Sequence, residues 1–198
     1  MMVHLSVMEN AKTVSSSQVV MSKVMEPTDA NFLGKVFGGS ILSLLDLTAY
    51  AAASKFAGNI CVTASFDRVD FLEPIEVGEL VTCEGHVSYV GRTSLEVTIN
   101  VYADKIYTGT RRHTNTARVT MVAIKDGKPQ PVPRLICETK EEKKMFLEGR
   151  LRRELRAHQR SELETLIQQI ANSSEEELDS YLECENLLSE LKEKRKDV

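Results

Sequence analysis

The chain has 198 residues, of which 42% are hydrophobic, and a formal net charge of −4 at pH 7. This length allows one domain with a sizeable core. The slightly acidic balance excludes the concentrated basic surface of nucleic-acid-binding proteins, so no nucleic-acid partner is expected. The four cysteines are widely separated, without a CxxC pair or a histidine at metal-ligand spacing, and we expect reduced structural thiols with no metal bound.

Residues 1–16 show no hydrophobic period and run into a series of serines, so they are expected to form a flexible arm. The sequence lacks the basic start and apolar run of a leader peptide, and it contains no uncharged apolar stretch of about 18 residues. A cytoplasmic protein without membrane insertion is therefore expected. Residues 18–25 are rich in β-branched and apolar side chains and predict a strand that ends before Pro27.

Turn-forming residues fill positions 28–36 and lead into Gly38 and Gly39, which predicts a loop followed by a helix over residues 39–56. This helix is apolar almost all round, as is typical of a buried helix. Asp46 is the single charged residue between positions 37 and 53. Because burying an unpaired carboxylate is costly, Asp46 is a candidate functional residue.

After residue 60, the spacing of hydrophobic residues changes from that of a helix to that of β-strands. Four strands are predicted in an antiparallel sheet with short connections, over residues 61–71, 79–89, 93–103 and 110–124. One strand, one buried helix and four strands allow a curved sheet to wrap around a central helix within a domain of residues 17–136. Such a unit leaves sheet edges unpaired, so at least a homodimer is expected.

Residues 137–198 differ sharply in composition, being rich in Glu, Lys, Arg and Leu and without proline. They predict a helical C-terminal extension in three parts: an amphipathic segment around Leu151, a helix that begins at a capping box of Ser161 and Glu164, and a last helix capped at residues 172–177. Its charges alternate in sign, which favours solvated helices packing on the body or on a neighbouring subunit. A regulatory or partner-binding role is the alternative.

Gly39 and Asp46 are seven residues apart, nearly two helical turns, and so lie on one helix face. Amides at the helix start can stabilise an oxyanion, while the carboxylate can activate water or attack a carbonyl. Gly38 and Gly39 also let a ligand approach the backbone closely. Asn31 lies in the loop just before this helix, and its side-chain amide can orient a carbonyl group or a water molecule. The structural alternatives are an ordinary helix start, an Asp bonded to a polar neighbour and an Asn that forms a turn.

Other catalytic arrangements find little support. Ser40 and Ser43 have no nearby histidine and no G-x-S-x-G motif, which argues against a serine esterase. His113 lies in a polar strand segment where an exposed side chain is expected. The sequence contains no P-loop and no dinucleotide-binding glycine pattern.

Five motifs together resemble the hotdog-fold acyl-CoA thioesterases, in particular the group of small bacterial acyl-CoA hydrolases and the brain-type cytosolic acyl-CoA hydrolase. In chain order they are Pro27–Gly34, Phe37–Gly39 with Asp46, Val69–Ile75, Val77–Glu79 and Val90–Ser94. The resemblance covers about residues 17–134. It implies an α+β hotdog fold, paired as a double hotdog and often as a trimer of dimers. It also implies hydrolysis of acyl-CoA to fatty acid and CoA without a metal or redox cofactor.

The resemblance also implies roles for individual residues. The aspartate that matches Asp46 is the general base or nucleophile, and the asparagine that matches Asn31 acts across the dimer on the water or thioester carbonyl. The glycine that matches Gly39 offers its N–H to the thioester oxygen. The segment that matches Gly91-Arg92-Thr93-Ser94 lies near CoA, so Arg92, Thr93 and Ser94, with Gly38, are expected CoA contacts. Family members with two fused repeats divide the Asp and Asn between them, whereas this chain carries both, so two equivalent sites per homodimer are expected.

Two other functions stay open. A non-catalytic acyl-CoA-binding or sensing protein could use the same fold, although a binder has no need of a carboxylate near a thioester. A hotdog dehydratase normally has a histidine beside the carboxylate, and no histidine lies in the helix or its approach loop.

Overall fold

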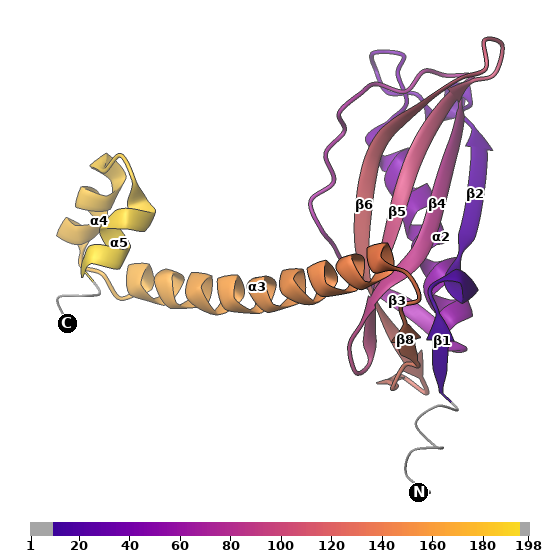
Figure 1. The fold of residues 1–198 in the computed structure, drawn as a ribbon. Coiled ribbons are helices and arrows are strands. Elements are labelled where there is room, and N and C mark those ends of the chain that lie inside the picture. The colour runs from indigo at the N-terminus through magenta and orange to yellow at the C-terminus, as the bar shows by residue number, and fades with distance from the viewer. Residues whose placement is uncertain (1–9, 195–198) are drawn as a thin grey trace, which may run out of the picture. The chain divides into compact units, whose positions relative to one another are not determined.

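The computed structural model describes residues 10–194, which form two compact units with the boundary between Gly149 and Arg150. The first unit contains an antiparallel sheet in the order β2-β4-β5-β6-β3, with the short strand β7 (Lys128–Pro129) paired to β6. Its strands are listed here in sheet order: β2 (Val19–Val24), β4 (Leu80–Val90), β5 (Ser94–Lys105), β6 (Thr110–Lys125) and β3 (Ile60–Phe66). The sheet curves around helix α2 (Gly38–Ala57), as Figure 1 shows. The predicted hotdog-like α+β fold is therefore confirmed.

The inner face of the sheet and α2 form the core. Alternate residues of β5 point inward, and Leu95, Val97, Ile99 and Val101 are at most 1% exposed. They pack with small and apolar residues of α2, which lets the helix lie close to the sheet. Gly85 marks the tightest approach, because a Cβ there would lie 2.8 Å from Cγ2 of Thr48 on α2. The helix ends where Gly58 adopts a left-handed conformation (φ 69°), as the sequence predicts.

Helix α2 is only partly buried, which corrects the expectation of a wholly buried helix. Its outward side chains Leu42, Leu47 and Tyr50 are exposed in the single chain. Strand β3 is also shorter than predicted, since it ends at Phe66 and residues 67–79 mostly form a loop. Residues 67–71 carry three charged side chains, Asp67, Arg68 and Asp70, and they lie outside the sheet ladder, which ends at Phe66.

The N-terminal segment differs from the expected flexible arm. Residues 1–9 lie outside the described part, but β1 (Ala11–Thr13) pairs in parallel with β8 (Arg134–Ile136), and a 3₁₀ turn, η1 (Ser15–Ser17), follows. The Lys12 ammonium donates to the Phe56 carbonyl at 2.6 Å, near the end of α2. This pairing joins segments far apart in the sequence, so local periodicity gives no sign of it.

The extension consists of helices α3 (Lys140–Ala171), α4 (Glu175–Glu183) and α5 (Leu187–Lys194). Helix α3 runs unbroken through Ser161, so the helix start predicted there is wrong. The Ser174 side chain caps α4 as predicted, with Glu177 completing the capping box. The single last helix expected is in fact two, because the Asn186 side chain begins α5 by accepting from the Ser189 amide at 3.1 Å.

Within the second unit, Leu166, Tyr181 and Leu191 form a small buried cluster with Ile170 beside it. Glu162 and Lys192 form an ion pair at 2.7 Å. Across residues 10–194, no helix is both long enough and apolar enough to cross a membrane.

Candidate functional site

Asp46 is half-buried on α2, and its carboxylate is held by a neighbouring strand. Its Oδ1 accepts a hydrogen bond of 2.5 Å from Oγ1 of Thr63 on β3. The same hydroxyl lies 3.4 Å from the sulfur of Met121 on β6, which is fully buried. Thr63 has one hydroxyl proton, and it is donated to the Asp46 carboxylate in the shorter of these two contacts. The bond orients one carboxylate oxygen and leaves the other for chemistry.

Thr63 is the functional candidate that sequence reasoning missed. The only signal available was the two-residue alternation from buried Cys61, which places Thr63 on the side of β3 that faces the helix. The pairing of β3 with β6 becomes irregular between Thr63 and Ser65. Such irregularities are common beside active sites, where they redirect a side chain.

Gly38 and Gly39 are the first two residues of α2, whose N-cap, Phe37, makes no side-chain hydrogen bond to the helix. Their amides have no preceding helical carbonyl to bond, so they are donors available to a ligand. A Cβ at Gly39 would clash with the Phe37 ring. The ring of Phe71 lies over Gly38, 3.4 Å from where a Cβ would be. Two exposed aromatic rings thus flank the helix start.

The start of α2 is fixed by Asp29. The Asp29 carbonyl accepts from the Phe37 amide at 2.7 Å, and its carboxylate accepts from the Glu26 amide at 3.0 Å. The Lys23 ammonium donates to the same carboxylate at 2.7 Å, and this hydrogen bond lowers the pKa of Asp29. The ionised side chain therefore anchors the loop that leads into the helix.

Asn31 organises its own loop. Its Oδ1 accepts from the backbone amides of Leu33 and Lys35, at 2.9 and 3.1 Å. These bonds identify the amide oxygen and leave the Nδ2 group to donate outward. Gly34 closes the turn with φ 73°. Within the part of the chain that the structure describes, no hydrogen bond joins Asn31 to Asp46.

The turn at Arg92 lies at the other end of the sheet from Gly38. Because Val24 pairs with Leu80, the loop that leads to α2 lies where β4 begins, whereas the turn follows its far end. Eleven residues of β4 rising about 3.3 Å each separate these ends by roughly 30 Å. The Arg92 side chain is exposed. One chain therefore brings Asp46 and Thr63 together, but not the expected CoA contacts Arg92, Thr93 and Ser94.

No group of three or more metal-ligating side chains occurs among residues 10–194. The arrangement places an oriented carboxylate about two helical turns along α2 from the free amides at the start of the helix, and the outward face of that helix is uncovered in the single chain. Such a pair can activate a nucleophile and stabilise the oxyanion that its attack creates.

Comparison with known proteins gives a consistent result. The Thioesterase superfamily profile matches residues 33–110. Protein VdlD of Helicobacter pylori is 40% identical over 141 residues, which cover 71% of this chain and 80% of VdlD. YkhA of Bacillus subtilis, named an uncharacterized acyl-CoA thioester hydrolase, is 40% identical over 127 residues, or 64% of this chain and 74% of YkhA. The mouse cytosolic acyl coenzyme A thioester hydrolase is 34% identical over 141 residues, covering 70% of this chain but only 37% of the mouse protein.

Solved structures agree with the sequence relatives. A hexameric acyl-CoA thioesterase superposes with a TM-score of 0.73 at 38% identity, covering 76% of this chain and 97% of that one. An acyl-CoA hydrolase from Staphylococcus aureus, solved with butyryl-CoA and CoA, has a TM-score of 0.72 at 33% identity and covers 82% and 99%.

The Staphylococcus aureus hydrolase has also been solved with alanine in place of an asparagine, an aspartate or a threonine. Those three positions are separated by 15 and 17 residues, the separations between Asn31, Asp46 and Thr63 in this chain.

Proposed function

The chain belongs to the thioesterase superfamily, and from this membership we infer that it is an acyl-CoA thioester hydrolase. It converts acyl-CoA and water into a free fatty acid and CoA. The observation that carries this function is the Asp46 carboxylate, which Thr63 holds at 2.5 Å on the helix whose first amides are unbonded.

Asp46 acts on the thioester carbon in one of two ways. As a general base it takes a proton from water, whose oxygen then attacks the carbon; as a nucleophile it attacks that carbon itself, and water later releases the acyl group. In both routes the carbon–sulfur bond breaks, the CoA sulfur leaves as a thiol after gaining a proton, and the water oxygen ends in the fatty acid. The Gly39 amide binds the thioester oxygen as negative charge develops there.

Asn31 completes the site from a second copy of the chain. Its Oδ1 is fixed by two backbone amides, so its Nδ2 is presented to whatever lies across the interface. There it donates to the attacking water or to the thioester carbonyl. Each homodimer then has two equivalent sites. Arg92, Thr93 and Ser94 are CoA contacts in this proposal, with Gly38 allowing close approach of the ligand.

The homodimer forms through the outward face of α2 and the edge strand β3. This surface carries Leu47, which is 52% exposed, and Ile60, which is 64% exposed, beside Tyr50 and Val62. An exposed apolar edge strand is unfavourable in an isolated chain, and pairing removes it from water. Assembly of three dimers into a hexamer is proposed by analogy with the hexameric acyl-CoA thioesterase. A cytoplasmic location is proposed in line with the mouse relative named cytosolic.

Release of free thiol from a panel of acyl-CoAs tests this function. Replacing Asp46 by Ala or Asn should lower the rate by about two to four decades, because a positioned general base is worth that much. Lys125→Gln, at an exposed position of β6, is the matched control and should keep the wild-type rate. Equal turnover by wild type and Asp46→Ala would contradict the proposal. Tight acyl-CoA binding without thiol release would instead indicate the binding or sensing protein.

A further inference from the structure

A hollow whose walls include none of the proposed catalytic residues lies beside β8, the first turns of α3 and the β4–β5 turn, which carries the proposed CoA contacts Arg92, Thr93 and Ser94. It has a volume of about 510 Å³, and its walls include Val90, Val132, Leu135, Ile136 and Phe146, with Arg134 as the charged member. Pockets for small organic ligands have volumes of about 300–1,000 Å³. Its size and apolar walls are therefore those of a small-molecule site.

A second hollow, of about 370 Å³, lies next to the first. The two share Leu135 and Phe146, and the second adds Leu147, Cys137 and Lys143. The Phe146 ring is held against Tyr89, with 5.1 Å between the ring centroids. The two hollows together form a groove that passes Phe146; we refer to it as the β8–α3 groove.

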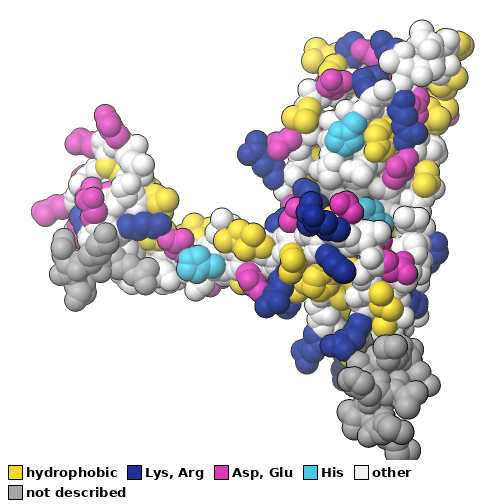
Figure 2. All heavy atoms as spheres, viewed as in Figure 1, with side chains coloured by type: hydrophobic (Ala, Val, Ile, Leu, Met, Phe, Trp, Pro, Cys, Tyr) yellow, Lys and Arg dark blue, Asp and Glu magenta, His cyan; other side chains and the backbone are white. Residues whose placement is uncertain are grey.

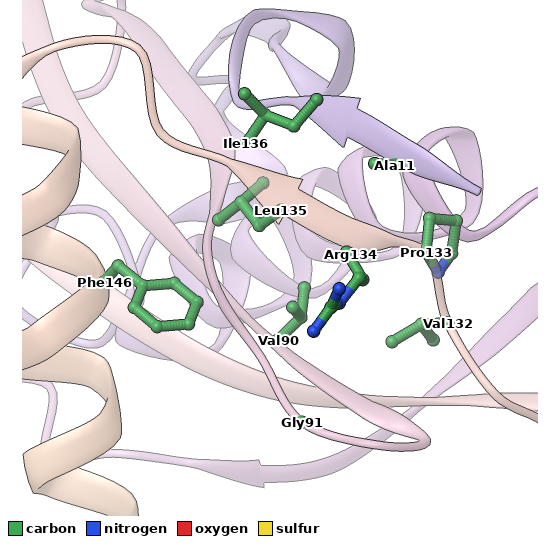
Figure 3. Close-up of a pocket in the computed structure, with 9 residues that line it drawn as sticks. All are labelled: Ala11, Val90, Gly91, Val132, Pro133, Arg134, Leu135, Ile136 and Phe146. Atoms are coloured by element: carbon green, nitrogen blue, oxygen red, sulfur yellow. The ribbon is translucent and has the colours of Figure 1, made fainter. Parts of the chain in front are cut away.

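Each of the two hollows has one cationic side chain among its lining residues, Arg134 in the first and Lys143 in the second. In Figure 3 the Arg134 side chain extends from β8 toward the same side as Val90 and Val132, with the Phe146 ring facing that space from α3. Among the residues that the structure describes, no carboxylate pairs with Arg134 or with Lys143. Figure 2 shows dark blue and yellow side chains together where α3 begins. The groove is therefore mainly apolar. Arg134 is the charged side chain of the first hollow, whereas in the second hollow Lys143 lies near Cys137 together with the carboxylate of Glu142.

We propose that the β8–α3 groove binds a free fatty acid, with the carboxylate on Arg134 and the alkyl chain along Leu135 and Phe146. The apolar walls remove the chain from water, and the guanidinium supplies a charge-assisted hydrogen bond to the carboxylate. A fatty acid is also the product class of the proposed function, so the choice of ligand rests on that function, whereas the groove itself does not. The site would let the enzyme sense its product.

Dodecanoate binding, measured by calorimetry, tests the proposal. The protein is first saturated with a non-hydrolysable thioether analogue of an acyl-CoA, which occupies the site at Asp46. One dodecanoate should then bind per chain, and Arg134→Gln should weaken binding about tenfold or more through loss of the charged hydrogen bond. Dodecanol should bind wild type more weakly than dodecanoate. Lys125→Gln, which removes a distant exposed cation, should bind dodecanoate like wild type.

A second variant tests the proposal by filling part of the groove. Ala11→Phe places a ring in the hollow and should exclude dodecanoate without changing charge. The proposal is overturned if the thioether analogue abolishes dodecanoate binding, or if Arg134→Gln binds as tightly as wild type. Thiol release from acyl-CoA, measured on the same wild-type preparation, reports on the proposed hydrolysis separately, because the calorimetric readout does not require turnover.

Discussion

The hydroxyl of Thr63 is the smallest feature on which the proposed chemistry depends. Its bond to Oδ1 of Asp46 is short and joins α2 to the edge strand, so it limits the rotation of the carboxylate. A misplaced catalytic group can cost up to about a hundredfold in rate. In the proposed function, Thr63 is thus a positioning residue, which acts through Asp46.

Thr63→Val keeps the shape of the side chain and removes the hydroxyl. We expect kcat for acyl-CoA hydrolysis to fall about ten- to a hundredfold, since Asp46 is no longer held, with little change in KM. Thr63→Ser retains the hydroxyl and should recover most of the rate. Steady-state kinetics of thiol release check this. A valine variant with wild-type kcat, or a serine variant as slow as valine, would show that the bond has no catalytic role.

Glu79 gives a prediction about pH and stability. Its buried carboxylate accepts two hydrogen bonds of 2.7 Å from Arg112, and this pairing is the main reason that the pKa of Glu79 lies below its ordinary value of 4.5. A carboxylate whose pKa is lower in the folded than in the unfolded protein stabilises the fold at pH values above its unfolded-state pKa. This contribution is lost as the pH falls through its folded-state pKa. Glu79→Gln should cost roughly 2–3 kcal/mol at neutral pH.

Urea unfolding of wild type and Glu79→Gln across a pH series checks this prediction. The difference in unfolding free energy should shrink as the pH falls below about 4.5, because protonated glutamate resembles glutamine. Glu84→Gln is the control: Glu84 pairs with Arg111 at 2.6 Å, but both side chains are over 40% exposed, so its loss should cost at most about 1 kcal/mol. A pH-independent difference for Glu79→Gln would refute the linkage.

The residues of the candidate site were predictable only where they share one element. Gly39 and Asp46 lie on α2, so helical spacing alone relates them. Two-residue alternation places Thr63 on the side of β3 that faces the helix, but it does not pair Thr63 with Asp46, which lies on a different element. Asn31 was correctly weighed as a turn former, since its Oδ1 closes its own loop. The catalytic role proposed for Asn31 depends on a second chain, which no single-chain pattern can reveal.

Among the elements, α2 and β3 have the least favourable surfaces in the single chain. The helix was predicted to be buried because it is apolar all round, yet Leu47 and Tyr50 are exposed. The sequence pattern is consistent with burial once a second copy covers this face, because hydrophobicity does not distinguish an intramolecular neighbour from an intermolecular one.

Tyr50→Glu tests whether this helix face is the dimer interface. Placing a carboxylate in an apolar contact should cost enough to shift the protein toward monomers, because the charge loses its water on association. Multi-angle light scattering should give about half the mass of the smallest wild-type assembly. Thiol release should fall with it, since the proposed function has Asn31 acting across the interface.

Val20→Glu is the matched control for Tyr50→Glu. Val20 is 65% exposed on β2, the opposite edge strand of the sheet, and its replacement should leave the dimer intact. An unchanged dimer mass for Tyr50→Glu would place the interface elsewhere. Dissociation by both variants to the same extent would point to general destabilisation.

The ends of helices agree with the sequence-based prediction where capping residues next to those ends set them. Gly58 ends α2 through its positive φ, and Ser174 with Glu177 caps α4, each as predicted. Ser161 and Glu164 have the same capping pattern but lie inside α3, where the Ser161 carbonyl accepts a side-chain hydrogen bond from Thr165. A capping pattern starts a helix only where the preceding residues are not already helical. The β1–β8 pairing had no local signal at all.

At the scale of the whole molecule, the proposed catalytic residues all precede residue 95, whereas the extension has a small core of its own. Leu166 and Leu191 are buried there with Tyr181, whose ring also has the Lys194 ammonium 4.4 Å from its centroid. Several leucines of the extension, among them Leu163 and Leu182, are exposed in the single chain. Exposed apolar side chains at this density favour contacts with another subunit.

Truncation after Gln159 tests that role. The cut keeps Phe146 and Gly149 against Tyr89 but removes the cluster of Leu166, so the first unit should stay folded. We expect thiol release per chain within about twofold of wild type, since the 10²–10⁴-fold contribution of a positioned base resides in residues that remain. Light scattering should show a smaller assembly. The full-length variant Leu166→Asp, which places a carboxylate in the buried cluster, should reproduce the mass change. Unchanged assembly in both proteins would exclude a role for the extension in subunit contacts, because each removes its folded core by a different route.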